Sequence, residues 1–142
     1  MSEYDSDILA WSEHRAELLR RLAAGERVND QVDWENVAEE IESVGRSQLS
    51  AVRSHIIQAF LHDLKAQAWP LARDVAHWQS EARLQRIQAA EAYAPSMRDK
   101  INLADLYAKA LRIMPEAMDD QGPLPLSPVC PFGRIEELFS EP

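Results

Sequence analysis

Carboxylate and imidazole side chains in this 142-residue chain could hold a metal ion or transfer protons. Glu40 and Glu42 lie early in a long helical pattern, and His55, His62 and His77 follow them. Such side chains, projecting into a helix bundle, form di-metal centres, so a metal-dependent enzyme with a His/carboxylate site is one hypothesis. The spacing argues against it. The sequence contains no Glu-x-x-His pair, and Glu40 and His62 would lie about 33 Å apart on one helix. We therefore predict neither a metal nor a cofactor.

The same histidines belong to a line of polar residues inside an apolar stripe. At steps of seven from Ile41, the sequence has Gln48, His55 and His62, where a plain core would have Leu or Ile. An antiparallel third helix would bring His77 opposite His62. A buried polar group without a hydrogen bond costs about 1 to 3 kcal/mol, so each needs a partner. We predict a buried polar cluster with a structural role, made of Gln48, His55, His62 and His77.

A second polar set lies between residues 33 and 47. Asp33 is placed to cap a helix, and Glu42 and Arg46 form an i,i+4 pair, so these charges have local explanations. The rest fall opposite the apolar stripe or along one of its edges when residues are placed at about 100° steps. They indicate either a solvated helix face or an interaction surface for a protein partner, a second copy or a small ligand. The members of this surface are Asn36, Glu39, Glu40, Ser43 and Ser47.

Gly45 lies in the middle of the same helical pattern. If the first two helices are antiparallel, Trp11 comes close to Gly45, and the missing side chain would make room for the indole. Gly45→Leu is then expected to destabilise the protein through overpacking.

Helical periodicity predicts an all-α fold with four main helices. We expect helices over residues 5–24, 33–67 and 74–93, and a fourth that is capped by Ser96 and runs to about Met114. Ile41 and Val44 belong to the expected core stripe of the second helix. Residues 119–131 contain four prolines and predict an extended docked segment, before a short terminal helix over 134–139. We expect one helical domain over residues 1–142.

The amino-acid composition limits the classes of partner that the protein is expected to bind. The net charge of −9 and the sequence pI near 4.9 disfavour nucleic acid and anionic membranes. A nuclease or toxin–antitoxin component is an alternative, based on a basic strip of Arg83, Arg86 and Arg98, but the acidic balance opposes it. A single cysteine, Cys130, permits no internal disulfide, and no segment resembles a signal peptide or a membrane span. We expect a cytoplasmic protein.

The run from Asn36 to Ser47 resembles the signature Asn-Leu-Ala-Glu-Glu-Ile-Glu-Ser-Met-Gly-Arg-Ser of the bacterial family called domain of unknown function 29. Val44 stands where that signature has Met. Other matching segments follow in order: Leu61 to Lys65, Trp78 with Gln85 and Arg86, Pro95 to Arg98, and Cys130 to Phe132. The resemblance implies a bacterial, cytoplasmic, helical bundle whose activity is not established. We predict a small binding or regulatory protein, acting through protein or small-ligand contacts, rather than an enzyme.

Overall fold

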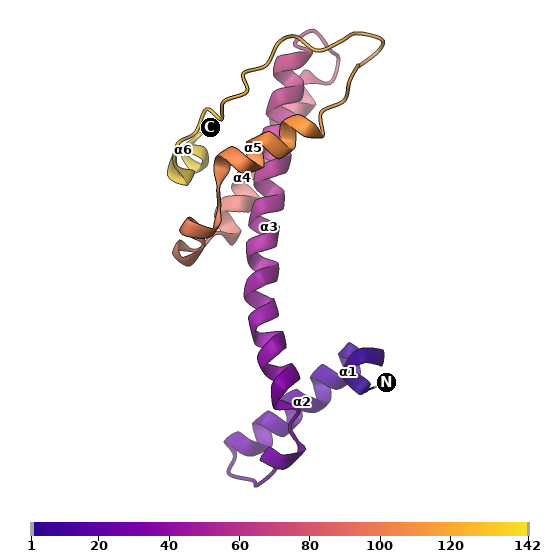
Figure 1. Cartoon of the computed structure of the whole chain (residues 1–142), viewed down its shortest axis with the longest axis vertical. Coiled ribbons are helices and arrows are strands. Elements are labelled where there is room, and N and C mark those ends of the chain that lie inside the picture. The colour runs from indigo at the N-terminus through magenta and orange to yellow at the C-terminus, as the bar shows by residue number, and fades with distance from the viewer. Residues whose placement is uncertain (1, 142) are drawn as a thin grey trace. The chain divides into compact units, whose positions relative to one another are not determined.

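The computed structural model describes residues 2–141 and is built from helices (Figure 1). In chain order these are α1 (Glu3–Ser6), α2 (Ile8–Ala23), α3 (Trp34–Ala68), α4 (Val75–Ala92), α5 (Leu103–Arg112) and α6 (Ile135–Ser140), with 3₁₀ turns at Asn29–Gln31 and Pro95–Lys100. The described residues contain no β-strand, and α2 to α5 are the four main helices. The predicted all-α class is confirmed. No helix within this range is long and apolar enough to cross a lipid bilayer.

Contacts divide the chain into two compact units, Met1–Arg46 (unit 1) and Ser47–Pro142 (unit 2). The first part of α3 belongs to unit 1 and the remainder to unit 2. The expected single domain over residues 1–142 stays a prediction, because a division by contacts does not say whether the two units unfold together.

Unit 1 begins with two helices where the sequence predicted one over residues 5–24. Asp7, with φ −151° and ψ 83°, lies outside the helical region and ends α1. Its side chain then accepts a hydrogen bond from the Ala10 backbone N–H at 3.0 Å and so caps α2. The prediction was wrong at this end because apolar spacing does not reveal a cap inside the pattern. At the other end, Gly25 has φ +97°, the left-handed conformation that commonly ends a helix.

The core of unit 1 lies between α2, the 3₁₀ turn and the start of α3. Its buried members are Trp11, Leu18, Val28, Val32 and Val37, with Tyr4, Leu19 and Leu22 packed against them. Residues 24–33 return the chain so that α2 and α3 can both contribute to this core. Helix α3 begins at Trp34, directly after Asp33, as predicted.

Gly45 does not accommodate Trp11. A Cβ atom at Gly45 would have no heavy atom within 4 Å, so the position is open. The overpacking expected for Gly45→Leu is therefore wrong. The sequence argument assumed a helix register that places the indole beside Gly45, whereas the indole bonds to Asp33 at the start of α3.

We now expect Gly45→Ala to raise the free energy of unfolding by about 0.5 to 1 kcal/mol, because Ala is the better helix former at an open mid-helix position. Denaturant unfolding followed by circular dichroism measures this change. Gly25→Ala is the matched control and should destabilise, because its φ of +97° strains any residue with a Cβ. A loss of stability in Gly45→Ala would contradict the open position.

Unit 2 is organised around the second part of α3. Its main core cluster contains Val52, Ile56, Phe60, Leu64, Ala89, Met97, Leu103, Leu106, Tyr107, Ala110, Ile135 and Leu138. Helix α3 ends at Ala68, before Trp69 and Pro70, and α4 is flanked by Asp74 and Tyr93, as predicted. The short terminal helix also forms, one residue later than predicted at each end, and contacts α4 (Figure 1).

The fourth main helix starts later than predicted. Pro95–Lys100 form a 3₁₀ turn that makes no side-chain cap and buries Met97. The α-helix begins at Leu103, after Asn102, whose side-chain oxygen accepts from the Asp105 backbone N–H at 3.1 Å. Ser96 is therefore not the cap. Asn is as good a cap as Ser, and its position lets the turn carry Met97 into the core.

The proline-rich segment after α5 is docked on unit 2, as predicted. The Leu124 backbone N–H donates to the Ala68 carbonyl at 3.0 Å, and the Trp69 indole N–H donates to the Gln121 carbonyl, also at 3.0 Å. The Tyr107 hydroxyl donates to the Ser127 carbonyl at 2.6 Å. These bonds join residues 121–127 to the end of α3, to Trp69 and to α5.

Candidate functional site

The five residues of the predicted interaction surface all lie on α3 and fall in both compact units. Asn36, Glu39, Glu40 and Ser43 belong to unit 1, and Ser47 belongs to unit 2, where it is exposed. Ser43 is half-buried. The other three bond within unit 1, as described next. Whether these five residues act in binding stays a prediction.

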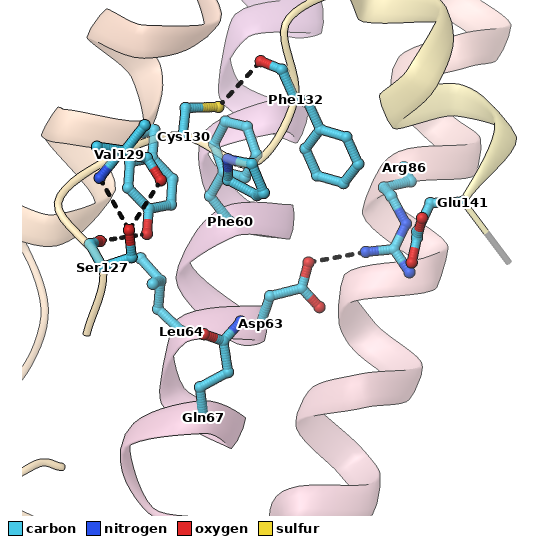
Figure 2. Close-up of a pocket in the computed structure, with 12 residues that line it drawn as sticks. Phe60, Asp63, Leu64, Gln67, Arg86, Ser127, Val129, Cys130, Phe132 and Glu141 are labelled. Carbon is cyan, nitrogen blue, oxygen red and sulfur yellow. Dashed lines mark hydrogen bonds and ion pairs between the residues drawn. The ribbon is translucent and has the colours of Figure 1, made fainter. Parts of the chain in front are cut away.

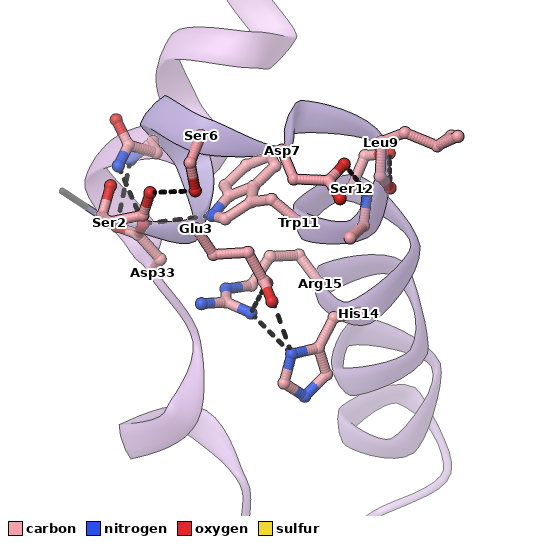
Figure 3. Close-up of polar contacts among 12 residues, drawn as sticks. Ser2, Glu3, Ser6, Asp7, Leu9, Trp11, Ser12, His14, Arg15 and Asp33 are labelled. Carbon is pink, nitrogen blue, oxygen red and sulfur yellow. Dashed lines mark hydrogen bonds and ion pairs between the residues drawn. The ribbon is translucent and has the colours of Figure 1, made fainter.

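The Asp33 carboxylate is the centre of a hydrogen-bond network in unit 1 (Figure 3). It accepts from the Trp11 indole N–H at 3.2 Å, and from the Asn36 side-chain amide at 2.8 Å. The bond from Asn36 and that from Trp11 hold the pKa of Asp33 below its usual range, against the opposing effect of burial. The Arg15 guanidinium lies 5.7 Å from the centre of the Trp11 ring. Asn36 is thus explained as a residue that positions the cap of α3.

The two glutamates of the predicted surface have different partners. Glu40 accepts a hydrogen bond from the Tyr4 hydroxyl at 2.7 Å, and this bond, with the surrounding carboxylates, raises the pKa of Tyr4 to about 12. The contact fastens α1 to α3. Glu39 is exposed and accepts from Arg46 at 2.6 Å, while Arg46 also makes the predicted pair with Glu42 at 3.6 Å. Exposed pairs of this kind contribute little to stability.

An apolar groove runs between α2 and the first part of α3 in unit 1, with a volume of about 230 Å³. Ile41 and Val44 are assigned to the core by the sequence pattern but are 68% and 71% exposed on its wall. The pattern could not show that α2 covers only one side of α3. The residues that line the groove are Trp11, Ser12, Arg15, Ala16, Leu19, Val37, Glu40, Ile41 and Val44.

The predicted buried polar cluster of unit 2 is not formed. Gln48 is exposed and donates to the Ala92 carbonyl at 3.3 Å. His77 is exposed, and no polar partner is found for it within residues 2–141. A straight α-helix drifts by about 20° per seven residues, so positions seven apart do not keep facing one neighbour.

The two remaining histidines are half-buried but bond separately. His55 hydrogen-bonds through Nδ1 to Gln85 Oε1 at 2.7 Å, and the Gln85 amide donates to Glu81. His62 Nδ1 donates to the Gln58 carbonyl at 2.7 Å, within its own helix. The structure therefore gives these histidines structural partners and does not join them. In the described range, no group of three or more His, Cys, Asp or Glu side chains is arranged to hold a metal ion.

The basic strip expected from Arg83, Arg86 and Arg98 is also absent. Arg86 is 6% exposed, and its Nη1 donates to Asp63 Oδ2 at 2.9 Å. Arg98 forms an ion pair with Glu136. Because Arg86 lies inside unit 2 and Arg98 is neutralised, these three side chains do not present one basic surface.

The Asp63–Arg86 pair lines a cavity of about 720 Å³ in unit 2 (Figure 2). Asp63 comes from α3, Arg86 from α4 and Tyr107 from α5, and residues 127–132 close one side. Burial raises the pKa of Asp63, and Arg86 counters that effect only in part. Sequence reasoning did not place these residues at one site. A signal existed, because three segments of the family resemblance contribute Asp63, Arg86 and Cys130 to this cavity.

Comparison with solved structures finds the same fold elsewhere. The chain is similar to an alpha-helical protein of unknown function from Rhodospirillum rubrum ATCC 11170, with 28% sequence identity and a TM-score of 0.69. The likeness covers 99% of this chain and 91% of that one. No curated protein sequence matches the chain.

The family comparison covers nearly the whole sequence. The model described as "Domain of unknown function DUF29" matches residues 3–141. This match confirms the resemblance seen in the Asn36 to Ser47 run. The family and the Rhodospirillum rubrum protein are both described as being of unknown function. The chain belongs to the DUF29 family.

Proposed function

We propose that this protein is a binding protein that holds a basic amphipathic helix of a partner protein in the groove of unit 1. The observation that carries the proposal is the exposure of Ile41 and Val44 on the wall of that groove. Single exposed apolar residues are common, but these two adjoin Trp11, Leu19 and Val37 in one concave apolar surface. A groove between two helices is suited to the apolar face of a third.

The negative charge of unit 1 favours a basic partner. Residues 1–46 carry 5 Arg and 12 Asp or Glu side chains, a net charge of −7 out of −9 for the whole chain. The charged residues that line the groove are Arg15 and Glu40, and Glu40 is engaged by the Tyr4 hydroxyl, so the negative charge comes from unit 1 as a whole. An acidic surface attracts a basic helix and repels a second acidic unit. This is why a basic partner helix is a better occupant than a second copy of the same unit.

A cytoplasmic location is part of the proposal. Cys130 is a free thiol in the structure, and free thiols persist in reducing compartments. In this setting the protein would act by binding alone, and the hydrogen bonds of Asn36 and Glu40 would keep α1 and α2 in place beside the groove.

A designed helical peptide with a Leu face and Lys flanks tests the groove. We expect it to bind the full chain in an NMR titration, with saturable shifts at the groove residues. The double variant Ile41→Ser/Val44→Ser should weaken binding at least about tenfold, since two apolar contacts are lost. Raising the salt concentration should weaken it further, because the steering charges are exposed.

Two controls distinguish specific binding in the groove from non-specific hydrophobic association. A peptide with the same Leu face and Glu flanks should not bind, and Leu84→Ser/Ile87→Ser, which changes exposed apolar residues on α4, should bind like the parent. Equal binding of the acidic peptide would contradict the proposal. So would a concentration-dependent dimer, seen by analytical ultracentrifugation, that Ile41→Ser/Val44→Ser abolishes, because a second copy would then occupy the groove.

A further inference from the structure

The cavity of unit 2 combines an apolar wall with a carboxylate-rich polar end. Phe60, Leu64 and Phe132 form apolar parts of the lining, and Asp63, Gln67 and Glu141 add polar ones. Figure 2 shows Asp63 directed toward Arg86 from the neighbouring helix, with Gln67 further along α3. The volume of about 720 Å³ lies within the range of about 300 to 1,000 Å³ that is usual for small-molecule sites.

Several polar groups of the lining are already engaged within the protein. The Tyr107 hydroxyl donates to the Ser127 carbonyl at 2.6 Å. The Cys130 thiol donates to the Phe132 carbonyl at 3.4 Å. Arg86 uses its Nη1 group on Asp63 Oδ2 at 2.9 Å. These groups do not need a ligand, and the cationic charge of Arg86 already faces a carboxylate.

Acceptor groups remain at the polar end. Within residues 2–141, no hydrogen bond is found to Asp63 Oδ1, to the side-chain amide of Gln67 or to the carboxylate of Glu141. Asp63 and Gln67 are four residues apart on α3 and so lie on one face of the helix. Two carboxylates stand against one guanidinium, so the lining carries a net negative charge when all three groups are ionised. The side chain of Asp63 is 32% exposed and can be reached by a ligand.

We propose that this cavity binds a small organic cation, a primary amine on an apolar or aromatic body. The ammonium group would donate to Asp63 Oδ1 and to the side-chain oxygen of Gln67, and the body would lie against Phe60 and Phe132. An ammonium group has three donors and no acceptor, which matches a site that offers acceptors. A carboxylate ligand fits less well, because it would meet Asp63 and Glu141.

This site is independent of the groove proposed for partner binding. Its residues all belong to unit 2, whereas Ile41 and Val44 belong to unit 1. The variant Ile41→Ser/Val44→Ser should therefore leave amine binding unchanged, so that failure of one proposal does not imply failure of the other.

An NMR titration of the full chain tests the amine site. The probes are 2-phenylethylamine, 2-phenylethanol and 3-phenylpropionate, which share the ring and differ in the charge of the head group. We expect saturable shifts at the cavity residues with the amine, and a dissociation constant at least about tenfold lower than for the alcohol or the acid. Asp63→Asn, which keeps an oxygen for Arg86, should weaken amine binding at least about tenfold because it removes the charge.

A second variant covers the case in which Asp63→Asn does not fold. Gln67→Leu changes an exposed residue, so it should fold like the parent and weaken the amine alone. Gln79→Leu, at an exposed position on α4 that does not line the cavity, is the control and should bind like the parent. Equal affinity for the three probes, or no saturable shift up to about 10 mM amine, would overturn the proposal.

Discussion

Trp11→Ala is expected to lower the free energy of unfolding of unit 1 by about 3 to 5 kcal/mol. Trp11 is 3% exposed and is the largest side chain in the core of that unit. Its ring meets Tyr4 edge to face, with centroids 4.9 Å apart, and its N–H reaches the Asp33 carboxylate. Removing the indole leaves a cavity, deprives Asp33 of a donor and loosens α1 at the same time. A unit of this size has a small free energy of unfolding, so this loss is a large fraction of it.

Hydrogen exchange of the full chain measures this loss region by region. Amides of α2 should lose protection in Trp11→Ala. Trp11→Phe is the matched control: it keeps an aromatic ring and loses only the N–H donor and part of the volume, so its cost should be clearly smaller. If Trp11→Ala kept the parent's protection in α2, the indole would not be the anchor of unit 1.

Phe60→Ala is expected to cost about 3 to 5 kcal/mol in unit 2. Phe60 is 2% exposed on α3. Its ring lies edge-on to Tyr107 of α5, with centroids 5.4 Å apart, and is stacked on Phe132 of the C-terminal segment at 6.3 Å. One side chain therefore joins three parts of the unit. Truncation leaves a void beside the existing cavity, which the proline-rich segment cannot fill without moving.

Denaturant unfolding of Phe60→Ala gives the change in stability, and hydrogen exchange shows its extent. Leu84→Ala, at a 45% exposed position on α4, is the control and should stay within about 0.5 kcal/mol of the parent. A similarly small change in Phe60→Ala would contradict its role at this junction. The same data test the single-domain prediction: one cooperative domain requires that amides of unit 1 lose protection together with those of unit 2.

The two proposed sites differ in their shape and in the ligand that each would bind. The groove of unit 1 is shallow and apolar, lies in an acidic unit, and suits a helix that brings its own backbone hydrogen bonds. The cavity of unit 2 is lined by three helices, residues 127–132 and Glu141, offers acceptor groups, and suits a small molecule. The DUF29 family and the Rhodospirillum rubrum protein are of unknown function, so both roles are open to direct test.

Local chemistry in the sequence determined most of the helices. Trp69 and Pro70 end α3 because the residue before proline is pushed out of the helical region. Asp33 accepts from the Asn36 backbone N–H at 3.5 Å at the start of α3. Asp74 precedes α4 but makes no capping bond through its side chain. The prediction failed at the start of the fourth main helix, which is capped by Asn102 and not by Ser96, because the observed start lets the preceding 3₁₀ turn carry Met97 into the core. Asp7 was missed for a related reason, since a short helix before α2 is held by bonds outside the apolar pattern.

The candidate sites were decided by tertiary structure. A pattern of apolar residues identifies one face of a helix but does not show what covers that face. Ile41 and Val44 were therefore predicted to be buried, whereas both are exposed on the wall of a groove. Gly45 was predicted to pack against Trp11, whereas a Cβ atom at this position would have no heavy atom within 4 Å. Asp63 and Arg86 are 23 residues apart in the chain, and only the packing of α4 on α3 joins them. Helix ends follow from backbone sterics and local hydrogen bonds, which the sequence encodes within a few residues, whereas burial and the joining of distant side chains depend on how the helices pack.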